Sequence, residues 1–253
     1  MQLALFDLDH TLIPTDSDHA WGQFLVEQGE VDAMHFAAAN DRFYAQYCDG
    51  TLDIQAYLRF ALAPLASIDP QRLGELQDRF MRALIEPMIK PQALELVRKH
   101  QARGDLCVLI TATNEFVTAP IARRLGIEHL IACEVEQVDG RYTGLPRGIA
   151  SFREGKVIRI RHWIEAHQAM TGKDDEADTF QRILSRACFY SDSYNDLPLL
   201  EQVGFPVATN PDARLRAHAK SRAWPCLELF AEEVCVGHSN SDSGQPGSEG
   251  ALD

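Results

Sequence analysis

Short apolar segments that stop abruptly at polar residues recur along the chain, and they constrain its fold more than any other feature. Three of them, followed directly by Asp7, Thr111 and Ser191, are residues 3–6, 106–110 and 187–190. Apolar runs of this length indicate strands that are buried on both faces, as in a parallel sheet. Segments with helical spacing of apolar residues separate them. Repeated strand–helix units predict an α/β fold with a doubly wound parallel sheet.

The stretch between the first two strands has a different pattern. From about residue 17 to residue 90, apolar side chains recur at helical spacing, and Asp69-Pro70 is typical of a helix start. We therefore predict a small α-helical cap over residues 15–87, carried by a catalytic core of residues 1–14 and 88–236. The Ser-, Gly- and Pro-rich residues 237–253 are predicted to be a disordered tail.

The balance of charge bears on the partners. The 253 residues include 37 acidic and 24 basic ones, which gives a formal net charge of −13. An acidic surface repels nucleic-acid backbones and anionic lipid, so we expect neither as a partner. The chain shows no signal peptide and no apolar run of the roughly 20 residues that span a bilayer. Its six scattered cysteines form no CxxC pair, which favours a reduced, cytoplasmic protein.

Polar side chains follow the predicted strands at the point where each one ends. Because ligands of such sheets bind outside the carboxyl ends of the strands, these side chains are expected to meet in one site. Two close carboxylates such as Asp7 and Asp9 need a cation or a shared proton, although a polar loop explains the pair equally well. Thr111 at a strand tip suits an anion, whereas Thr113 and Asn114 are better explained as caps of the next helix.

Two further positions carry weaker signals. Lys156 falls in the first turn of a predicted helix, where its charge opposes the helix dipole, and this is a small argument against an ordinary surface lysine. Asp192, Asn195 and Asp196 offer oxygen atoms that suit Mg²⁺. A turn in which Asn195 or Asp196 caps a helix accounts for the same residues.

In this order, the clusters resemble the signature of the haloacid dehalogenase superfamily, in the branch that includes phosphoserine phosphatase. The resemblance covers the chain from Met1 to about Trp224, and residues 15–87 resemble the helical cap of that branch. Its DxDxT element corresponds to Asp7, Asp9 and Thr11, and its later motifs correspond to Thr111, Lys156, Asp192, Asn195 and Asp196. Ser191 stands where the fourth motif usually has glycine.

The resemblance implies a Mg²⁺-dependent phosphatase of a small phosphorylated metabolite, acting as a monomer or a homodimer. Asp7 would attack phosphorus, and Asp9 would protonate the leaving group and then activate water. The metal would be held by Asp7, the Asp9 carbonyl and Asp192. Asp196 would bind the metal through water or orient Lys156. The phosphate would be bound by Thr111, Lys156 and Asn195.

The cap is expected to select the substrate. In phosphoserine phosphatase an acidic residue after the first motif binds the amino group, and an arginine in the cap binds the carboxylate. Asp16 or Asp18 corresponds to the first, and Arg59 or Arg42 to the second. His10 either contacts the substrate or packs beside the site.

Several alternatives remain open. Ala112-Thr113 replaces the usual glycine pair of the second motif, so histidinol phosphate and other small phosphates stand beside phosphoserine. A phosphotransferase shares every motif, and a dehalogenase does not need Asp9. A catalytically silent binding module would be expected to lack at least one of the catalytic residues.

Overall fold

The computed structural model describes residues 2–171 and 179–230. Its sheet has the strand order β4-β3-β2-β1-β5-β6-β7. The strands are β1 (Leu3–Phe6), β2 (Leu106–Asn114), β3 (His129–Val138), β4 (Arg141–Arg147), β5 (Cys188–Ser191), β6 (Phe205–Thr209) and β7 (Cys226–Leu227). Neighbouring strands are parallel except β3 and β4, which form an antiparallel hairpin at one edge. The predicted α/β fold with a largely parallel sheet is confirmed.

Helices cover both faces of this sheet. They are α6 (Pro91–Ala102), α7 (Glu115–Leu125), α8 (Glu154–Thr171), α9 (Phe180–Leu184), α10 (Leu197–Leu200) and α11 (Ala213–Ser221). Alternate side chains of β1 point to opposite faces, as in any strand. Leu3 and Leu5 pack in a cluster with residues of α8, α9, α10 and α11, whereas Ala4 and Phe6 pack with residues of α6 and α7. Burial on both faces explains why these strands are continuously apolar.

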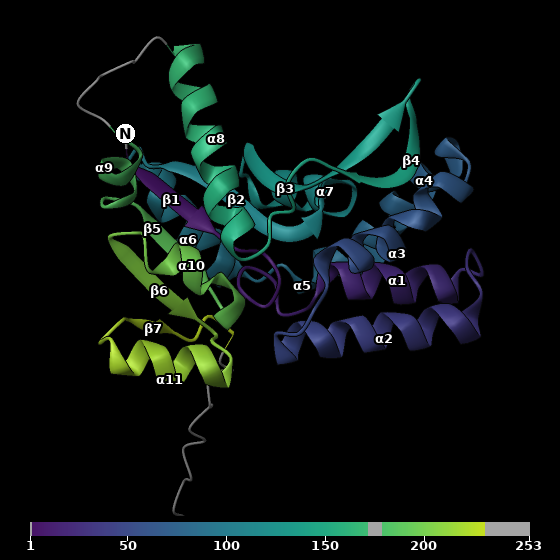
Figure 1. Ribbon diagram of the computed structural model, residues 1–253, viewed down its shortest axis with the longest axis horizontal. Helices are drawn as coiled ribbons and strands as arrows, with labels where there is room; N and C mark the ends of the chain where they lie inside the picture. Colours follow the sequence, from purple (N-terminus) through teal and green to yellow (C-terminus); the bar gives the residue numbers. More distant parts are fainter. Residues whose placement is uncertain (1, 172–178, 231–253) are drawn as a thin grey trace, which may run out of the picture.

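Every regular element between residues 15 and 87, all of them described, is helical. These elements are α1 (Ser17–Glu27), α2 (Ala33–Asp49), α3 (Ile54–Ser67), α4 (Pro70–Phe80), the π-helix η1 (Met81–Ile85) and α5 (Glu86–Met88). An aspartate side chain caps the first turn of each of the four long helices; these caps are Asp16, Asp32, Asp53 and Asp69. Figure 1 shows these helices on one side of the molecule and β1, β5, β6 and β7 on the other, with the β3–β4 hairpin reaching over to the helices.

Apolar packing joins this helical insert (residues 15–87) to the sheet. The ring of Trp21 lies 5.2 Å from that of Phe80 and 5.5 Å from that of Phe116 on α7, measured between centroids. The β3–β4 hairpin adds a second contact, because Gly144 lies against Ala63 and Ala66 of α3. One buried cluster therefore runs from β1 through α7 to the insert. The domain boundaries at residues 14/15 and 87/88 stay a prediction.

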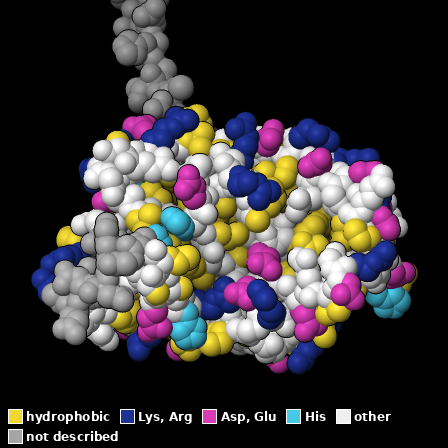
Figure 2. Space-filling view, turned by 90° about the horizontal axis from the view of Figure 1, so that it is seen from above, with side chains coloured by type: hydrophobic (Ala, Val, Ile, Leu, Met, Phe, Trp, Pro, Cys, Tyr) yellow, Lys and Arg dark blue, Asp and Glu magenta, His cyan; other side chains and the backbone are white. Residues whose placement is uncertain are grey.

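Two other expectations concern the outside of the molecule. The tail predicted over residues 237–253, and the last residues assigned to the core, lie outside the described residues. No helix within the described ranges is long and apolar enough to cross a membrane. On the face shown in Figure 2, acidic and basic side chains are interspersed with hydrophobic ones.

The hairpin contact yields a stability prediction. Gly140 and Gly144 both have positive φ, at 76° and 78°, so alanine costs backbone energy of about 1 kcal/mol at either position. An added Cβ meets nothing within 4 Å at Gly140, but at Gly144 it would lie 3.1 Å from the Ala66 Cβ. We expect Gly144→Ala to lower the free energy of unfolding by about 1 kcal/mol more than Gly140→Ala in urea denaturation. Equal losses would contradict the packing of β4 on α3.

Candidate active site

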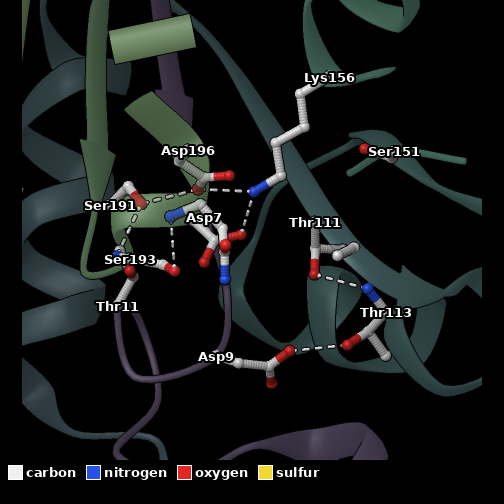
Figure 3. A network of polar contacts seen from close by, with 12 residues as sticks. Asp7, Asp9, Thr11, Thr111, Thr113, Ser151, Lys156, Ser191, Ser193 and Asp196 are labelled. Carbon is white, nitrogen blue, oxygen red and sulfur yellow. Dashed lines mark hydrogen bonds and ion pairs between the residues drawn. The ribbon is translucent and has the colours of Figure 1, made fainter. Parts of the chain in front are cut away.

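The ends of two neighbouring strands and the start of one helix bring the predicted residues together. Asp7 follows β1, Asp192 follows β5, and Lys156 reaches the same point from the first turn of α8. The Lys156 ammonium donates to Asp7 Oδ1 at 2.8 Å and to Asp196 Oδ2 at 2.7 Å (Figure 3). Lys156 is only 2% exposed, so its charge is compensated by these carboxylates rather than by water.

More carboxyl groups surround Lys156 than its single positive charge can neutralise. Burial raises the pKa of Asp7 to about 6, although the charge of Lys156 lowers it. Burial also raises the pKa of Asp192 well above its ordinary value, and the charges of Asp7 and Asp196 raise it further. The carboxyl groups of the site therefore repel one another more than Lys156 alone offsets. A bound cation would relieve this repulsion.

The donor set of the site fits one hard divalent ion. Within the described ranges, no three His, Cys, Asp or Glu side chains are grouped to hold a metal. Asp7 and Asp192 supply two buried carboxylates, and the backbone carbonyl of Asp9 is the third oxygen that the resemblance implies. Oxygen ligands in this number, completed by water, are what Mg²⁺ takes in proteins. Asp196 accepts instead from Lys156 and from Ser191 Oγ, the latter at 2.7 Å, which is the orienting arrangement of the two considered for it.

Asp9 is held at both carboxylate oxygens. The Ser17 N–H donates to Oδ1, and the Thr113 hydroxyl donates to Oδ2, both at 2.7 Å. Burial raises the pKa of Asp9 well above its ordinary value, and the charge of Asp16 raises it further. A carboxyl group with a raised pKa is suited to general acid catalysis.

Thr113 is a site residue that the sequence reasoning missed. It was interpreted as a helix cap, but the capping residue is Asn114, whose side chain accepts from the Val117 N–H. The strand β2 continues past Ile110 with an irregular register, and this turns the Thr113 hydroxyl towards Asp9 (Figure 3). The available signal was the resemblance, whose second motif usually has glycine at this position.

Loop contacts fix the remaining motif residues. Thr111 is buried, and its hydroxyl oxygen accepts from the Thr113 N–H at 3.2 Å. The Thr11 hydroxyl donates to Asp192 Oδ1 at 3.0 Å and ties the loop after β1 to the loop after β5. The Ser191 hydroxyl, where glycine is usual, holds Asp196 as described above.

Asn195 does not lie free beside the phosphate site. Its amide nitrogen donates to the Tyr47 carbonyl at 3.0 Å. Its Oδ1 accepts from the Arg153 guanidinium, with nitrogens at 3.2 and 3.3 Å. Both ends of the Asn195 amide thus have partners, and these partners connect the core to the end of α2.

A cavity extends from the catalytic carboxylates into the helical insert. Its walls are acidic and aromatic; among the lining residues are Asp7, Asp9, Asp16, Asp18, Phe43, Tyr44, Tyr47, Tyr57, Thr111 and Thr113. No lysine or arginine is among its lining residues in the described part of the chain. Arg59 and Arg42, the candidates for a substrate carboxylate, are exposed and outside the lining. Arg42 instead lies over the ring of Phe43.

Asp18 is the buried acid at the inner end of this cavity. It is 5% exposed, and burial followed by the charge of Asp16 raises its pKa to about 7. Its Oδ1 accepts from the Asn114 amide at 2.9 Å, while its buried Oδ2 has no hydrogen-bond partner among the described residues. Asp16 also lines the cavity, but its side chain already caps α1. Asp18 is therefore the better of the two candidates for a cationic ligand.

His10 packs beside the site without lining the cavity. It adopts a left-handed backbone conformation with φ of 54°. Its carbonyl accepts from the Asn210 amide at 2.9 Å, and its ring nitrogen lies 3.3 Å from the Tyr44 hydroxyl. These contacts link the loop after β1 to α2 and agree with the packing alternative.

The chain is similar to known phosphatases in sequence. A family model described as haloacid dehalogenase-like hydrolase matches residues 4–201. A histidinol-phosphatase of Neisseria meningitidis is 46% identical over 90% of this chain and 98% of its own length. The phosphoserine phosphatase SerB1 of Mycobacterium tuberculosis is 34% identical over 87% of this chain and 68% of its own length.

Solved structures give a consistent result. A protein of unknown function from Bordetella pertussis is 45% identical and superimposes with a TM-score of 0.79 over 90% of this chain and 99% of its own. A phospho-aspartyl intermediate analogue of phosphoserine phosphatase has a TM-score of 0.60 at 18% identity, over 89% and 92% of the two chains. The latter likeness concerns the fold alone.

The raised pKa of Asp18 predicts a pH-dependent effect on stability. Above pH 4 the unfolded chain releases this proton, but the folded protein keeps it until about pH 7. Ionised Asp18 therefore opposes folding as the pH rises, by up to about 4 kcal/mol. We expect Asp18→Asn to raise the free energy of unfolding at pH 8 and to leave it nearly unchanged near pH 4, measured by urea denaturation. The exposed Asp41→Asn is the control; the same pH profile in both variants would sink the assignment.

Proposed function

Because the chain belongs to the haloacid dehalogenase-like hydrolase family, we propose that it is a Mg²⁺-dependent phosphatase that forms an aspartyl-phosphate on Asp7. We further propose histidinol phosphate as its substrate. The observation that carries the proposal is the pairing of Asp7, oriented by the buried Lys156, with Asp9, a proton-retaining acid at the same cavity.

The first half of the reaction transfers the phosphoryl group to the protein. Lys156 holds Asp7 Oδ1, which leaves Oδ2 to attack phosphorus. A bond forms between this oxygen and phosphorus while the ester bond from phosphorus to the alcohol oxygen breaks. Asp9 gives its proton to the departing oxygen, so the alcohol leaves neutral. The Thr111 hydroxyl and the Lys156 ammonium bind oxygens of the transferred group.

The second half returns the protein to its starting state. Asp9, now a carboxylate, accepts a proton from a water molecule that attacks the phosphorus of the aspartyl-phosphate. The bond between phosphorus and Asp7 breaks, inorganic phosphate leaves, and Asp9 is protonated again. Hydrogen bonds from Ser17 and Thr113 keep the carboxylate in place through both proton transfers.

Asp7, the Asp9 carbonyl and Asp192 would hold Mg²⁺. When bound, the ion offsets the repulsion between the carboxylates and the phosphate and stabilises charge that develops during transfer. The Thr11 hydroxyl fixes the Asp192 carboxylate, and Ser191 with Lys156 keeps Asp196 turned away from this position.

The cavity favours a substrate with cationic and aromatic groups and without a carboxylate. Asp18 offers an unpaired carboxyl oxygen to an ammonium group, and the tyrosines beside it suit a flat ring. A carboxylate such as that of phosphoserine would face Asp16 and Asp18 with neither Arg59 nor Arg42 at hand. Histidinol phosphate carries an ammonium and an imidazole and has no carboxylate. The similarity to a histidinol-phosphatase supports the same choice.

Two further parts of the proposal concern the cellular compartment and the partner of the protein. We place the enzyme in the cytoplasm because the five cysteines in the described residues are free. A small phosphorylated metabolite is then its expected partner.

Two treatments test the nucleophile and the metal. Asp7→Asn should abolish turnover of a generic aryl phosphate, because an amide oxygen cannot form the covalent intermediate. A chelator should silence the unaltered protein, and added Mg²⁺ should restore it. Phosphate release is measured with Asp41→Asn as the matched control. Retained turnover in Asp7→Asn, or full activity in chelator, would refute the corresponding part of the proposal.

The variant Asp18→Asn tests whether Asp18 binds the amine of the proposed substrate. Removing its charge should lower kcat/KM for histidinol phosphate roughly 10- to 100-fold, the usual worth of a buried charge-assisted contact. Turnover of an aryl phosphate without an amine should change by less than about twofold, because that substrate makes no contact with Asp18. Equal losses of kcat/KM on both substrates would show that Asp18 does not bind the amine.

A further inference from the structure

Tyr47 reaches the catalytic end of the cavity from the helical insert. It lies near the end of α2, and its side chain lines the same cavity as Asp7 and Thr111. Burial of the phenol raises the pKa of Tyr47 well above its ordinary value, and the charges of Asp192 and Asp7 raise it further. The Ser193 hydroxyl, next to Asp192 in the loop after β5, lies within hydrogen-bonding reach of the phenol oxygen, so the Tyr47 hydroxyl is at the strand ends. Its raised pKa keeps the phenol protonated and able to donate.

The other tyrosines of the cavity face different groups. Burial raises the pKa of Tyr57 as well, but the next largest causes are the charges of Asp18 and Asp16. Tyr44 lies 3.3 Å from the His10 ring nitrogen through its hydroxyl. The cavity thus has a tyrosine hydroxyl at its amine-binding end and another, that of Tyr47, at its phosphate end.

A clamp fixes the backbone at Tyr47. Its carbonyl accepts from the Asn195 amide at 3.0 Å. Arg153 donates both to Asn195 Oδ1 and to the carbonyl of Gly50, three residues further along. The end of α2 is therefore bound to the loop that carries Asp192 and to the start of α8.

Arg153 holds this position in a strained conformation. Its φ is 50°, which costs a non-glycine residue about 1 kcal/mol or more. Glycine would adopt the same backbone at lower cost, but only a long donor side chain spans Asn195 and Gly50 together. Strain of this kind persists where surrounding contacts over-determine it. The guanidinium contacts are therefore the reason for an arginine here.

We propose that Tyr47 is a catalytic residue whose hydroxyl donates a hydrogen bond to an oxygen of the phosphoryl group on Asp7. Asn195 and Arg153 are positioning residues that hold Tyr47 in place. The inference rests on the proposed function, because it requires a phosphoryl group at Asp7. It also gives Asn195 a role, because its amide donates to the Tyr47 carbonyl and accepts from Arg153.

The variant Tyr47→Phe removes the hydroxyl but keeps the aromatic ring, which packs beside Phe152. We expect kcat to fall roughly 10- to 100-fold on both histidinol phosphate and an aryl phosphate, with the melting temperature unchanged. Inhibition by inorganic phosphate should weaken in parallel. Tyr57→Phe is the matched control and should affect only the amine-bearing substrate.

The outcomes distinguish this inference from the proposed function. Wild-type kcat in Tyr47→Phe, together with an inactive Asp7→Asn, would overturn the role of Tyr47 and leave the phosphatase proposal intact. An active Asp7→Asn would overturn both.

A double-mutant cycle tests the clamp. Arg153→Ala should lower kcat, and adding Tyr47→Phe should cause little further loss, because both changes remove the same phosphate contact. Arg214 donates to the neighbouring carbonyl of Asp49 without touching Asn195, so Arg214→Ala should leave kcat within about twofold of wild type. Fully additive losses in the double variant would overturn the positioning role.

Discussion

The buried ammonium of Lys156 lies between two carboxylates, and much of the arrangement at the strand ends depends on that contact. Removing a charge from water costs several kcal/mol unless opposite charges and hydrogen bonds replace the solvent. Asp7 and Asp196 supply the charges, and Ser191 secures Asp196 in turn. A lysine that opposes the dipole of its own helix is thus stabilised by groups from two different strand ends. The same contact leaves one oxygen of Asp7 free for chemistry.

The site gathers more negative charge than Lys156 offsets, so a phosphate group can bind there only if this excess is relieved. In the proposed mechanism, a divalent ion at Asp7 and Asp192 relieves part of the repulsion. A proton on Asp9 relieves another part and is then given to the leaving alcohol. Because the protein has a formal net charge of −13, its attraction for phosphate has to arise locally, from one lysine, the proposed metal site and nearby hydroxyl groups.

The helical insert contributes binding groups because it is packed onto the sheet. Aspartate caps begin its four long helices, and a continuous apolar cluster fixes them against α7 and the β3–β4 hairpin. This packing places Asp18 at one end of the cavity and Tyr47 at the other. In this proposal the residues at the sheet carry out the phosphate chemistry, and the insert binds the rest of the substrate. Tyr47 of the insert contributes to both.

The sequence alone determined most of the strands and helices and the edge of the sheet where the polar residues meet, but not the short elements α9 and β7. It did so because apolar periodicity and turn residues such as Asp69-Pro70 are local signals. Only the tertiary structure decided that Thr113 turns to Asp9, that Asn195 serves the end of α2, and that Arg59 stays outside the cavity. Those outcomes depend on a strand irregularity and on how the insert is rotated against the core. Both are set by contacts between residues far apart in the chain, which no local pattern records.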